Sequence, residues 1–332
     1  MFEIRTDLAV EEKESFPGRG GEVTGVSLRE WRKADSAIKL TEVVILDQEG
    51  ARAMGKAKGT YLTIEARCIV GGNEAYCREV SEELAEQLRR LTGKMRKKHL
   101  LPAAGPLHLL VTGLGNPSVT PDALGPETLN HLRVNRNLEE PPRTGQLPDQ
   151  AVISGIVPGV MAQTGMETAE ILKGVVEETG PDLVIAIDAL AARSIRRLGT
   201  TVQLTDTGIH PGSGVGNHRH GLTRESLGVP VIAIGVPTVV GAAAIVHDTI
   251  SALIQTLASA METKEAGDFL ESLDPDQQYQ LIRELLEPEF GSLYVTPPDI
   301  DQTIQKLGVI LAEAIHLAFC PQTSQNSPGI HI

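Results

Sequence analysis

Aromatic side chains are scarce in this sequence of 332 residues, of which Phe, Tyr and Trp together make up 3%. A folded core must therefore be built from aliphatic side chains, mainly Val, Ile, Leu and Ala. Cysteine is also rare: the three cysteines, Cys68, Cys77 and Cys320, have no metal-type spacing. Because an odd number of cysteines gives no disulfide framework, we expect free thiols in a reducing compartment.

The sequence has no apolar run of the roughly 20 residues needed to cross a bilayer, and its charged N-terminus does not resemble a secretory signal. We therefore expect a cytoplasmic protein with no membrane partner. Positive charge is in deficit as well, with a formal net charge of −13. This charge argues against broad binding to nucleic acid, which needs clustered cations. The basic run at 94–99 is expected to be a solvated helix end, or else a patch that steers acidic partners.

Two common catalytic motifs are missing. Neither a Gly-x-x-x-x-Gly-Lys-Ser/Thr phosphate loop nor a Gly-x-Ser-x-Gly nucleophile elbow occurs in the chain. Nucleotide hydrolysis and serine hydrolase chemistry therefore lose their main support. Glycine and proline, by contrast, are plentiful at 33 and 20 residues, which indicates many turns and backbone-lined loops.

After an irregular first forty residues, apolar segments alternate with glycine-rich loops and helical patterns. Strands are expected at 42–47, 60–66, 107–114, 151–156, 183–187, 200–204 and 229–236. Helices are expected after Ser81, after the capping-box pattern of Thr164 and Glu167, from Val239 to Met261, from Asp274, and after the cap Asp299. This alternation predicts an α/β three-layer sandwich with a mostly parallel sheet. In such sheets, chemistry occurs in loops at the carboxyl ends of the strands.

A glycine-rich segment directly after the strand at 107–114 carries the first candidate catalytic residue, Asp122. The segment runs from Gly113 to Pro126 and includes Asn116. Its glycines allow a tight turn at the strand's carboxyl end, and Pro126 can begin the next helix. Asp122 is then either a catalytic carboxylate on a rigid loop or a simple cap of that helix.

The second candidate, Asp188, follows the most apolar strand, 183–187. A carboxylate there is poorly solvated and needs a hydrogen-bond partner, a cation or a raised pKa. It could also cap a helix or pair with Arg193. If the two strands are neighbours, Asp122 and Asp188 face one crevice and share a proton. One of them could then activate water while the other acts as an acid on the scissile amide.

A third glycine-rich stretch, Thr205–Asn217, contains Asp206 and His210. Its Asp-Thr-Gly at 206–208 is typical of pepsin-type aspartic proteases, but those are all-β and need two such loops. The stretch could instead bind an anion or a substrate through backbone N–H groups, or be a plain turn cluster. His210 is either a third polar group at the site or a structural histidine.

Taken together, these segments resemble the germination protease family over nearly the whole chain. The matching stretches are Arg5–Glu11, Gly113–Asn116, Thr120–Pro126, Pro158–Gly165, Val184–Leu190, Arg193-Ser194 and Thr205–Asn217. Such a number of matches in one order is highly specific. We therefore treat this resemblance as the leading hypothesis.

The resemblance implies an atypical aspartic-type endopeptidase that begins the degradation of small acid-soluble spore proteins during germination, in the forespore and spore core. It implies a homotetramer, catalysis at the positions of Asp122 and Asp188, no metal and no cofactor. Asn116, Asp206 and His210 are candidate supporting or substrate-binding residues. The core is expected to resemble that of the hydrogenase maturation proteases.

The resemblance also implies a zymogen. The family cuts at sites resembling Thr-Glu-Phe/Ile-Ala-Ser-Glu/Asp, after the first acid, and residues 6–11, Thr-Asp-Leu-Ala-Val-Glu, have the same order. We expect self-cleavage between Asp7 and Leu8, in an irregular and easily reached segment. This gives a propeptide at 1–7 and one α/β domain at 8–332, with a peripheral helical region at 274–320. The alternative is a frayed terminus without a role.

Other functions fit parts of the sequence. Hydrogenase maturation proteases share Gly-x-Gly-Asn followed by an acidic residue, and they bind nickel through carboxylates and a histidine, so His210 could complete a nickel site. Gly-Leu-Gly-Asn-Pro also occurs in peptidyl-tRNA hydrolases, where it opens the chain and a catalytic histidine follows soon after. Here it begins beyond residue 110, and His131 lies in a helix. A non-catalytic module that binds spore proteins is the last alternative.

Overall fold

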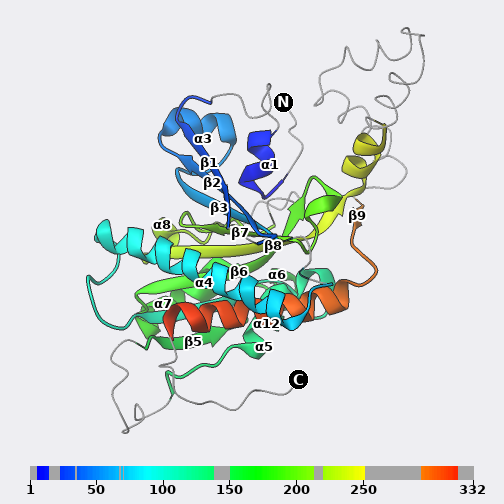
Figure 1. Cartoon of the computed structure of the whole chain (residues 1–332). Coiled ribbons are helices and arrows are strands. Elements are labelled where there is room, and N and C mark those ends of the chain that lie inside the picture. The colour runs from blue at the N-terminus through cyan, green and yellow to red at the C-terminus, as the bar shows by residue number, and fades with distance from the viewer. Residues whose placement is uncertain are drawn as a thin grey trace, which may run out of the picture.

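The computed structural model describes residues 6–14, 23–33, 36–66, 69, 71–137, 150–212, 220–250 and 293–320. Within these ranges, one mixed sheet of nine strands runs through the molecule, with helices packed on both faces (Figure 1). The strand order is β1-β2-β3-β7-β8-β6-β4-β5, and β9 pairs with the end of β8. The predicted α/β class is therefore confirmed.

The elements follow the alternation expected from the sequence, with additions at the N-terminus. The strands are β1 (Val26–Arg32), β2 (Lys39–Ile45), β3 (Gly59–Glu65), β4 (His108–Gly113), β5 (Val152–Ile156), β6 (Leu183–Ala192), β7 (Thr201–Thr205), β8 (Val231–Gly241) and β9 (Tyr294–Val295). The helices are α1 (Ala9–Glu14), α3 (Gln48–Met54), α4 (Glu74–Lys97), α5 (Leu124–His131), α6 (Met161–Thr164), α7 (Thr168–Thr179), α8 (Arg224–Leu227) and α12 (Ile300–Phe319). Two short 3-10 turns are η1 (Thr120–Asp122) and η2 (Ile195–Arg197).

The sheet is parallel only across β5, β4, β6 and β8. The other pairs, which involve β1, β2, β3, β7 and β9, are antiparallel. The prediction of a mostly parallel sheet is therefore wrong, because among the described strands the antiparallel pairs outnumber the parallel ones. The physical reason lies in the connections: residues 33–38 join β1 to β2, which is too short for the crossover that a parallel pair needs.

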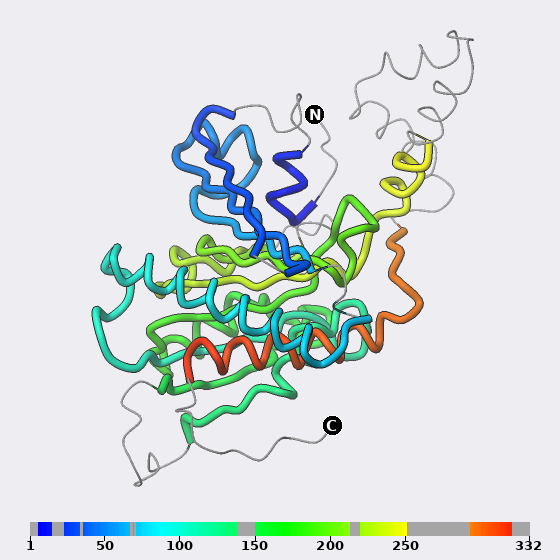
Figure 2. Tube along the Cα trace, viewed as in Figure 1, coloured from blue at the N-terminus to red at the C-terminus, as the bar shows by residue number. Residues whose placement is uncertain are grey.

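Helices cover both faces of the sheet. On one face, α4 and α12 lie side by side (Figure 2) and enclose the largest core, to which β6 contributes Ile185 and Ile187. On the other face, α7 and α8 belong to a second cluster that includes Val184 and Ala186 of the same strand. β6 is apolar on both faces because it is covered on both. No helix in the part that the structure describes is long and apolar enough to cross a membrane.

Two predicted helix starts are wrong. α4 begins at Glu74, capped by Asn73, whose Oδ1 accepts a hydrogen bond from Tyr76 N at 2.9 Å. Ser81, the predicted cap, lies inside that helix. β8 continues to Gly241, so Val239 belongs to a strand, which β9 extends by pairing. Apolar spacing alone does not locate such boundaries, because a cap or a pairing partner decides them.

The tail helix α12 packs in the main core rather than at the periphery. Its buried stripe, Ile304, Leu307, Leu311 and Ile315, lies against α4 and α5. This is the stripe that the helical spacing predicts. Residues 274–292, the first part of the region expected to be peripheral, lie outside the described ranges. The helix that follows them therefore belongs to the core of the fold.

Replacing a buried residue of α12 should destabilise the whole domain. Leu311 is 0% exposed, and Leu311→Ala is expected to lower the free energy of unfolding by about 2–5 kcal/mol, because it removes buried methyl groups and leaves a cavity. Val309→Ala, on the same helix at a position 37% exposed, should change it by no more than about 0.5 kcal/mol. Urea unfolding measures both. Equal effects of the two changes would contradict the core role of the helix.

Candidate active site

The two predicted catalytic aspartates come from neighbouring parallel strands: Asp188 lies in β6, and Asp122 lies in the loop that follows β4. The strands pair in parallel, and Leu114 N, just after β4, donates to Ile187 O at 2.8 Å. This bond joins the start of the Asp122 loop to the residue before Asp188. The turn η1, which ends at Asp122, packs against β6 and β8.

The Asp122 carboxylate is held by its own loop. Its Oδ2 accepts from Asn116 N at 2.7 Å, and Asn116 Oδ1 in turn accepts from Gln163 Nε2 at 3.1 Å. Gly115 allows the close approach: its φ is 107°, and a Cβ there would lie 1.9 Å from Asp122 O. The following helix, α5, receives no side-chain cap at Ala123. Asp122 therefore does not act as the helix cap considered from the sequence, and Asn116 supports its position.

Asp188 lies within β6 rather than at its end, because the strand continues to Ala192. Its residue is only 6% exposed, and its Oδ1 accepts from Ala189 N at 3.0 Å. Its partner on β8 is Gly235. Water has little access to this carboxylate, so its ionised form depends on neighbouring donors and charges.

Asp206 lies away from Asp188 along the sheet. In the antiparallel pair of β7 and β8, Gln203 lies opposite Gly235, which is also the partner of Asp188 on β6. Thr205 already lies opposite Ala233, so Asp206 is three residues further along the chain than the residue level with Asp188. Three residues along a strand correspond to roughly 10 Å. The Asp206 carboxylate accepts from Thr60 N at 2.6 Å and thereby fixes the start of β3.

The His210 ring packs beside the backbone of Gly221, next to the bridge between Ile209 and Leu222. Within the ranges that the structure describes, no group of three or more His, Cys, Asp or Glu side chains could hold a metal ion.

The N-terminal segment 6–14 is docked on the sheet, and it is not the irregular, easily reached segment expected from the sequence. Leu8 and Ala9 are 0% exposed, and α1 begins at Ala9. Leu8 packs in a cluster with Leu190, Ala192 and Leu198. Burial of apolar side chains makes docking more favourable than fraying.

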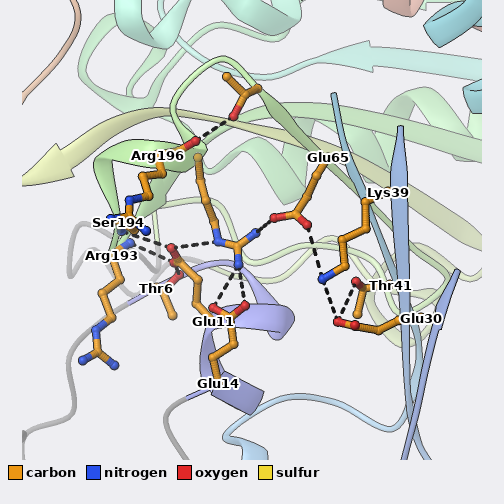
Figure 3. Close-up of polar contacts among 12 residues, drawn as sticks. Thr6, Glu11, Glu14, Glu30, Lys39, Thr41, Glu65, Arg193, Ser194 and Arg196 are labelled. Carbon is orange, nitrogen blue, oxygen red and sulfur yellow. Dashed lines mark hydrogen bonds and ion pairs between the residues drawn. The ribbon is translucent and has the colours of Figure 1, made fainter. Parts of the chain in front are cut away.

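A carboxylate from this segment is buried in the loop after β6. Glu11 is 3% exposed and accepts hydrogen bonds from Arg193 N at 2.8 Å and Ser194 N at 3.0 Å (Figure 3). Thr6 Oγ1 also donates to it, and Arg197 Nε lies 3.3 Å from its Oε1. Burial raises the pKa of the Glu11 carboxyl, and these hydrogen bonds and the charge of Arg197 offset that rise only in part.

The guanidinium of Arg197 joins carboxylates from three places. Besides Glu11, it pairs with Glu14 of α1 at 2.7 Å and with Glu65 of β3 at 2.5 Å. Figure 3 shows how the labelled Glu11, Glu14 and Glu65 converge, and how Lys39 extends the chain of ion pairs to Glu65. These ion pairs tie the N-terminal segment to the loop after β6 and to β3.

Two further side chains hold the peptide group that follows Asp7. Gln203 Nε2 and Lys56 Nζ donate to Asp7 O at 3.1 and 3.2 Å. Gln203 Oε1 accepts from Ala9 N at 2.8 Å. The side chain of Asp7 accepts from Ala191 N at 2.9 Å. The bond at which self-cleavage is predicted is thus held on both of its sides.

Sequence reasoning missed Lys56, Arg197 and Gln203. Only Gln203 carried a signal, because it is a polar residue in the middle of a predicted strand, and a buried amide needs partners. Lys56 and Arg197 looked like ordinary surface residues. Their partners lie far away in the sequence.

The structure defines an α/β protein in which the turn that ends at Asp122 packs against the central strand that carries Asp188. The comparisons with known proteins make this specific, since a family model described as "Germination protease" matches residues 3–275. The chain belongs to the germination protease family and is an endopeptidase, a hydrolase associated with spore germination.

Proteins of the same name are similar over nearly the whole chain. The germination protease of Caldanaerobacter subterraneus subsp. tengcongensis is 46% identical over 322 residues, covering 96% of this chain and 94% of the relative. That of Clostridium tetani is 41% identical over 325 residues, covering 96% of each. That of Bacillus velezensis is 37% identical over 368 residues, covering 99% of this chain and 96% of the relative.

The close approach at Gly115 gives a test of the site. Gly115→Ala should lower kcat/KM for a protein substrate on the order of 100-fold, because the new Cβ displaces the backbone of Asp122. Gly105→Ala is the matched control, since Gly105 also has a positive φ, 90°, but has no atom within 4 Å of the added Cβ. An equal loss in both variants would mean that backbone strain alone, and not Asp122, is responsible.

Proposed function

We propose that this endopeptidase begins the degradation of small acid-soluble spore proteins during germination, with Asp122 and Asp188 as its catalytic pair. The observation that supports this pair is the packing of the turn that ends at Asp122 against the strand that carries Asp188. Asp188 is buried in β6, and the turn that ends at Asp122 packs against β6 and β8. Membership of the family supports the substrate class.

In the proposed reaction, the two carboxyl groups share one proton, because two carboxylates at one site do not easily ionise together. The ionised group takes a proton from water, and the water oxygen attacks the carbonyl carbon of the substrate. The protonated group gives its proton to the amide nitrogen, and the C–N bond breaks. The products are a carboxylic acid and an amine, and the pair again holds one proton.

We further propose that the chain is made as a zymogen that cuts itself between Asp7 and Leu8. Residues 1–7 are then a short propeptide and 8–332 the mature domain. The order of residues 6–11 supports this, as does the set of contacts that hold the peptide group after Asp7. The homotetramer and the location in the forespore and spore core rest on the resemblance to the family alone.

The two aspartates can be tested by isosteric change. Asp122→Asn and Asp188→Asn should each lower cleavage of purified spore proteins by at least about 100-fold, because asparagine keeps the shape but cannot exchange the proton. Asp182→Asn is the control. Asp182 accepts from His108 N at the opposite end of β4, a role that an asparagine oxygen can keep. Full activity in either folded site variant would overturn the two-carboxylate mechanism.

Self-cleavage can be read directly from the N-terminus. After incubation at mildly acidic pH, where a shared proton is retained, Edman sequencing of the wild-type chain should begin at Leu8. The Asp188→Asn chain should still begin at Met1. A wild-type chain that is fully active and still begins at Met1 would show that no zymogen step exists in this protein.

A further inference from the structure

We propose that Glu11 binds the α-ammonium group that self-cleavage creates on Leu8, and that this ion pair holds the new N-terminus beside the loop that follows β6. The inference rests on the proposed cut between Asp7 and Leu8. It concerns residues 8–14, which remain in the chain after that cut. Glu11 is then a positioning residue of the mature enzyme.

The backbone nitrogen of Leu8 and the carboxylate of Glu11 are already joined through a single hydroxyl group. Leu8 N donates to Thr6 Oγ1 at 3.1 Å, and Thr6 Oγ1 donates to Glu11 Oε2 (Figure 3). All three residues are buried. Thr6 precedes the proposed cut, so self-cleavage removes the group that lies between the other two.

The position of Glu11 in α1 allows a direct contact with Leu8. The helix begins at Ala9, so Leu8 immediately precedes it and Glu11 is its third residue. A glutamate at the third position accepts a hydrogen bond from the N–H of the residue before the helix in the capping box. In the uncut chain, the Thr6 hydroxyl occupies this path. Once Thr6 has left, the same reach brings the Glu11 carboxylate to Leu8 N.

Cleavage changes Leu8 N from an amide nitrogen into an ammonium group. Water supplies the hydroxyl group of the new acid at Asp7 and one hydrogen of the new amine as the C–N bond breaks. The proton that this acid releases completes the ammonium. The new charge lies at the N-terminus of a helix, where the helix dipole is also positive, and at a buried residue. Such a charge needs a counter-ion.

The carboxylates around Arg197 can accept a further cation. One guanidinium pairs with Glu11, with Glu14 and with Glu65. Burial raises the pKa of the Glu11 carboxyl, and its present donors offset that rise only in part. An ammonium group at Leu8 supplies positive charge on the side of the carboxylate from which Thr6 has departed.

Two cations near the segment oppose a new ammonium group. Arg197 comes from η2, and Lys56, from the loop before β3, donates to the carbonyl oxygens of Thr6 and Asp7. Both of these carbonyl groups belong to the released peptide, and Lys56 is half-exposed, so its ammonium can turn to water after the cut. Arg197 remains paired with three carboxylates, so its charge is already balanced.

The ion pair connects the new N-terminus to the strand of Asp188. Glu11 accepts from Arg193 N at 2.8 Å and from Ser194 N at 3.0 Å, directly after β6 ends at Ala192. The cut removes the hydrogen bonds between Asp7 and β6. The contacts of Glu11 with the loop stay in place, and the ion pair with Leu8 N holds residues 8–14 against it.

The titration of the new amino group tests this ion pair in the wild-type chain. After self-cleavage and removal of the released peptide, the protein is labelled with a trace of acetic anhydride at a series of pH values. Mass spectrometry then measures the acetyl group on Leu8 N. A carboxylate partner raises the pKa of an amine, whereas burial without a partner lowers it. The midpoint should therefore lie at a higher pH in the folded chain than in the denatured chain.

A pair of variants assigns the partner. In cleaved Glu11→Gln, the midpoint should fall below that of the denatured chain, because the amine is buried without a carboxylate. Glu12→Gln makes the same change at the next residue of α1 and keeps Glu11, so its midpoint should stay at the wild-type value. A Glu11→Gln midpoint equal to that of the wild type would overturn the assignment to Glu11.

N-terminal sequencing separates this inference from the proposed self-cleavage. A wild-type chain that stays uncut between Asp7 and Leu8 overturns the self-cleavage, and the ion pair fails with it. A wild-type chain that is cut, but whose Leu8 amine titrates at or below the pH of the denatured chain, overturns the ion pair alone. This wild-type comparison decides the question even if Glu11→Gln does not cut itself.

Discussion

Strand β6 is covered by helices on both faces, and it nevertheless carries the carboxylate of Asp188. Its first residues are apolar on both sides, which fixes the strand in the centre of the sheet between β4 and β8. A carboxylate can stay buried there only if neighbouring groups replace the water it has lost. Two other segments depend on the position of this strand. The Asp122 loop is hydrogen-bonded to β6 at Ile187, and the N-terminal segment is hydrogen-bonded to it at Ala191.

The cluster around Arg197 shows a second buried charge under the same constraint. Exposed ion pairs such as Arg78 with Glu82 contribute little, since water screens them. Glu11 is different, because burial penalises its charge and two backbone N–H groups and a guanidinium compensate for part of that penalty. Removing one partner of such a buried pair is costly, because the other charge is left buried without compensation.

The two halves of the sheet make different contributions to the site. The parallel half carries Asp188 within β6 and Asp122 in the turn that follows β4. The antiparallel half holds the N-terminal segment through Gln203 of β7 and through Lys56, which lies just before β3. The halves meet at the β7–β8 pair, whose register places Gln203 opposite Gly235, the residue that also pairs with Asp188.

The sequence by itself determined the α/β class, most of the strands and the position of Asp122 in a loop after one of them, because apolar runs and glycine-rich loops are local signals. It ended the strand of Asp188 too early, since β6 continues to Ala192. It missed β1, whose residues are largely polar and exposed, and it placed the start of α4 at Ser81 because only the cap at Asn73 marks the true start. Only the tertiary structure decided the mixed sheet, the separation of Asp206 from the aspartates and the docking of residues 6–14. These features depend on partners distant along the chain, such as Ala9 and Gln203, which are 194 residues apart, and no local pattern records which distant segments will pair.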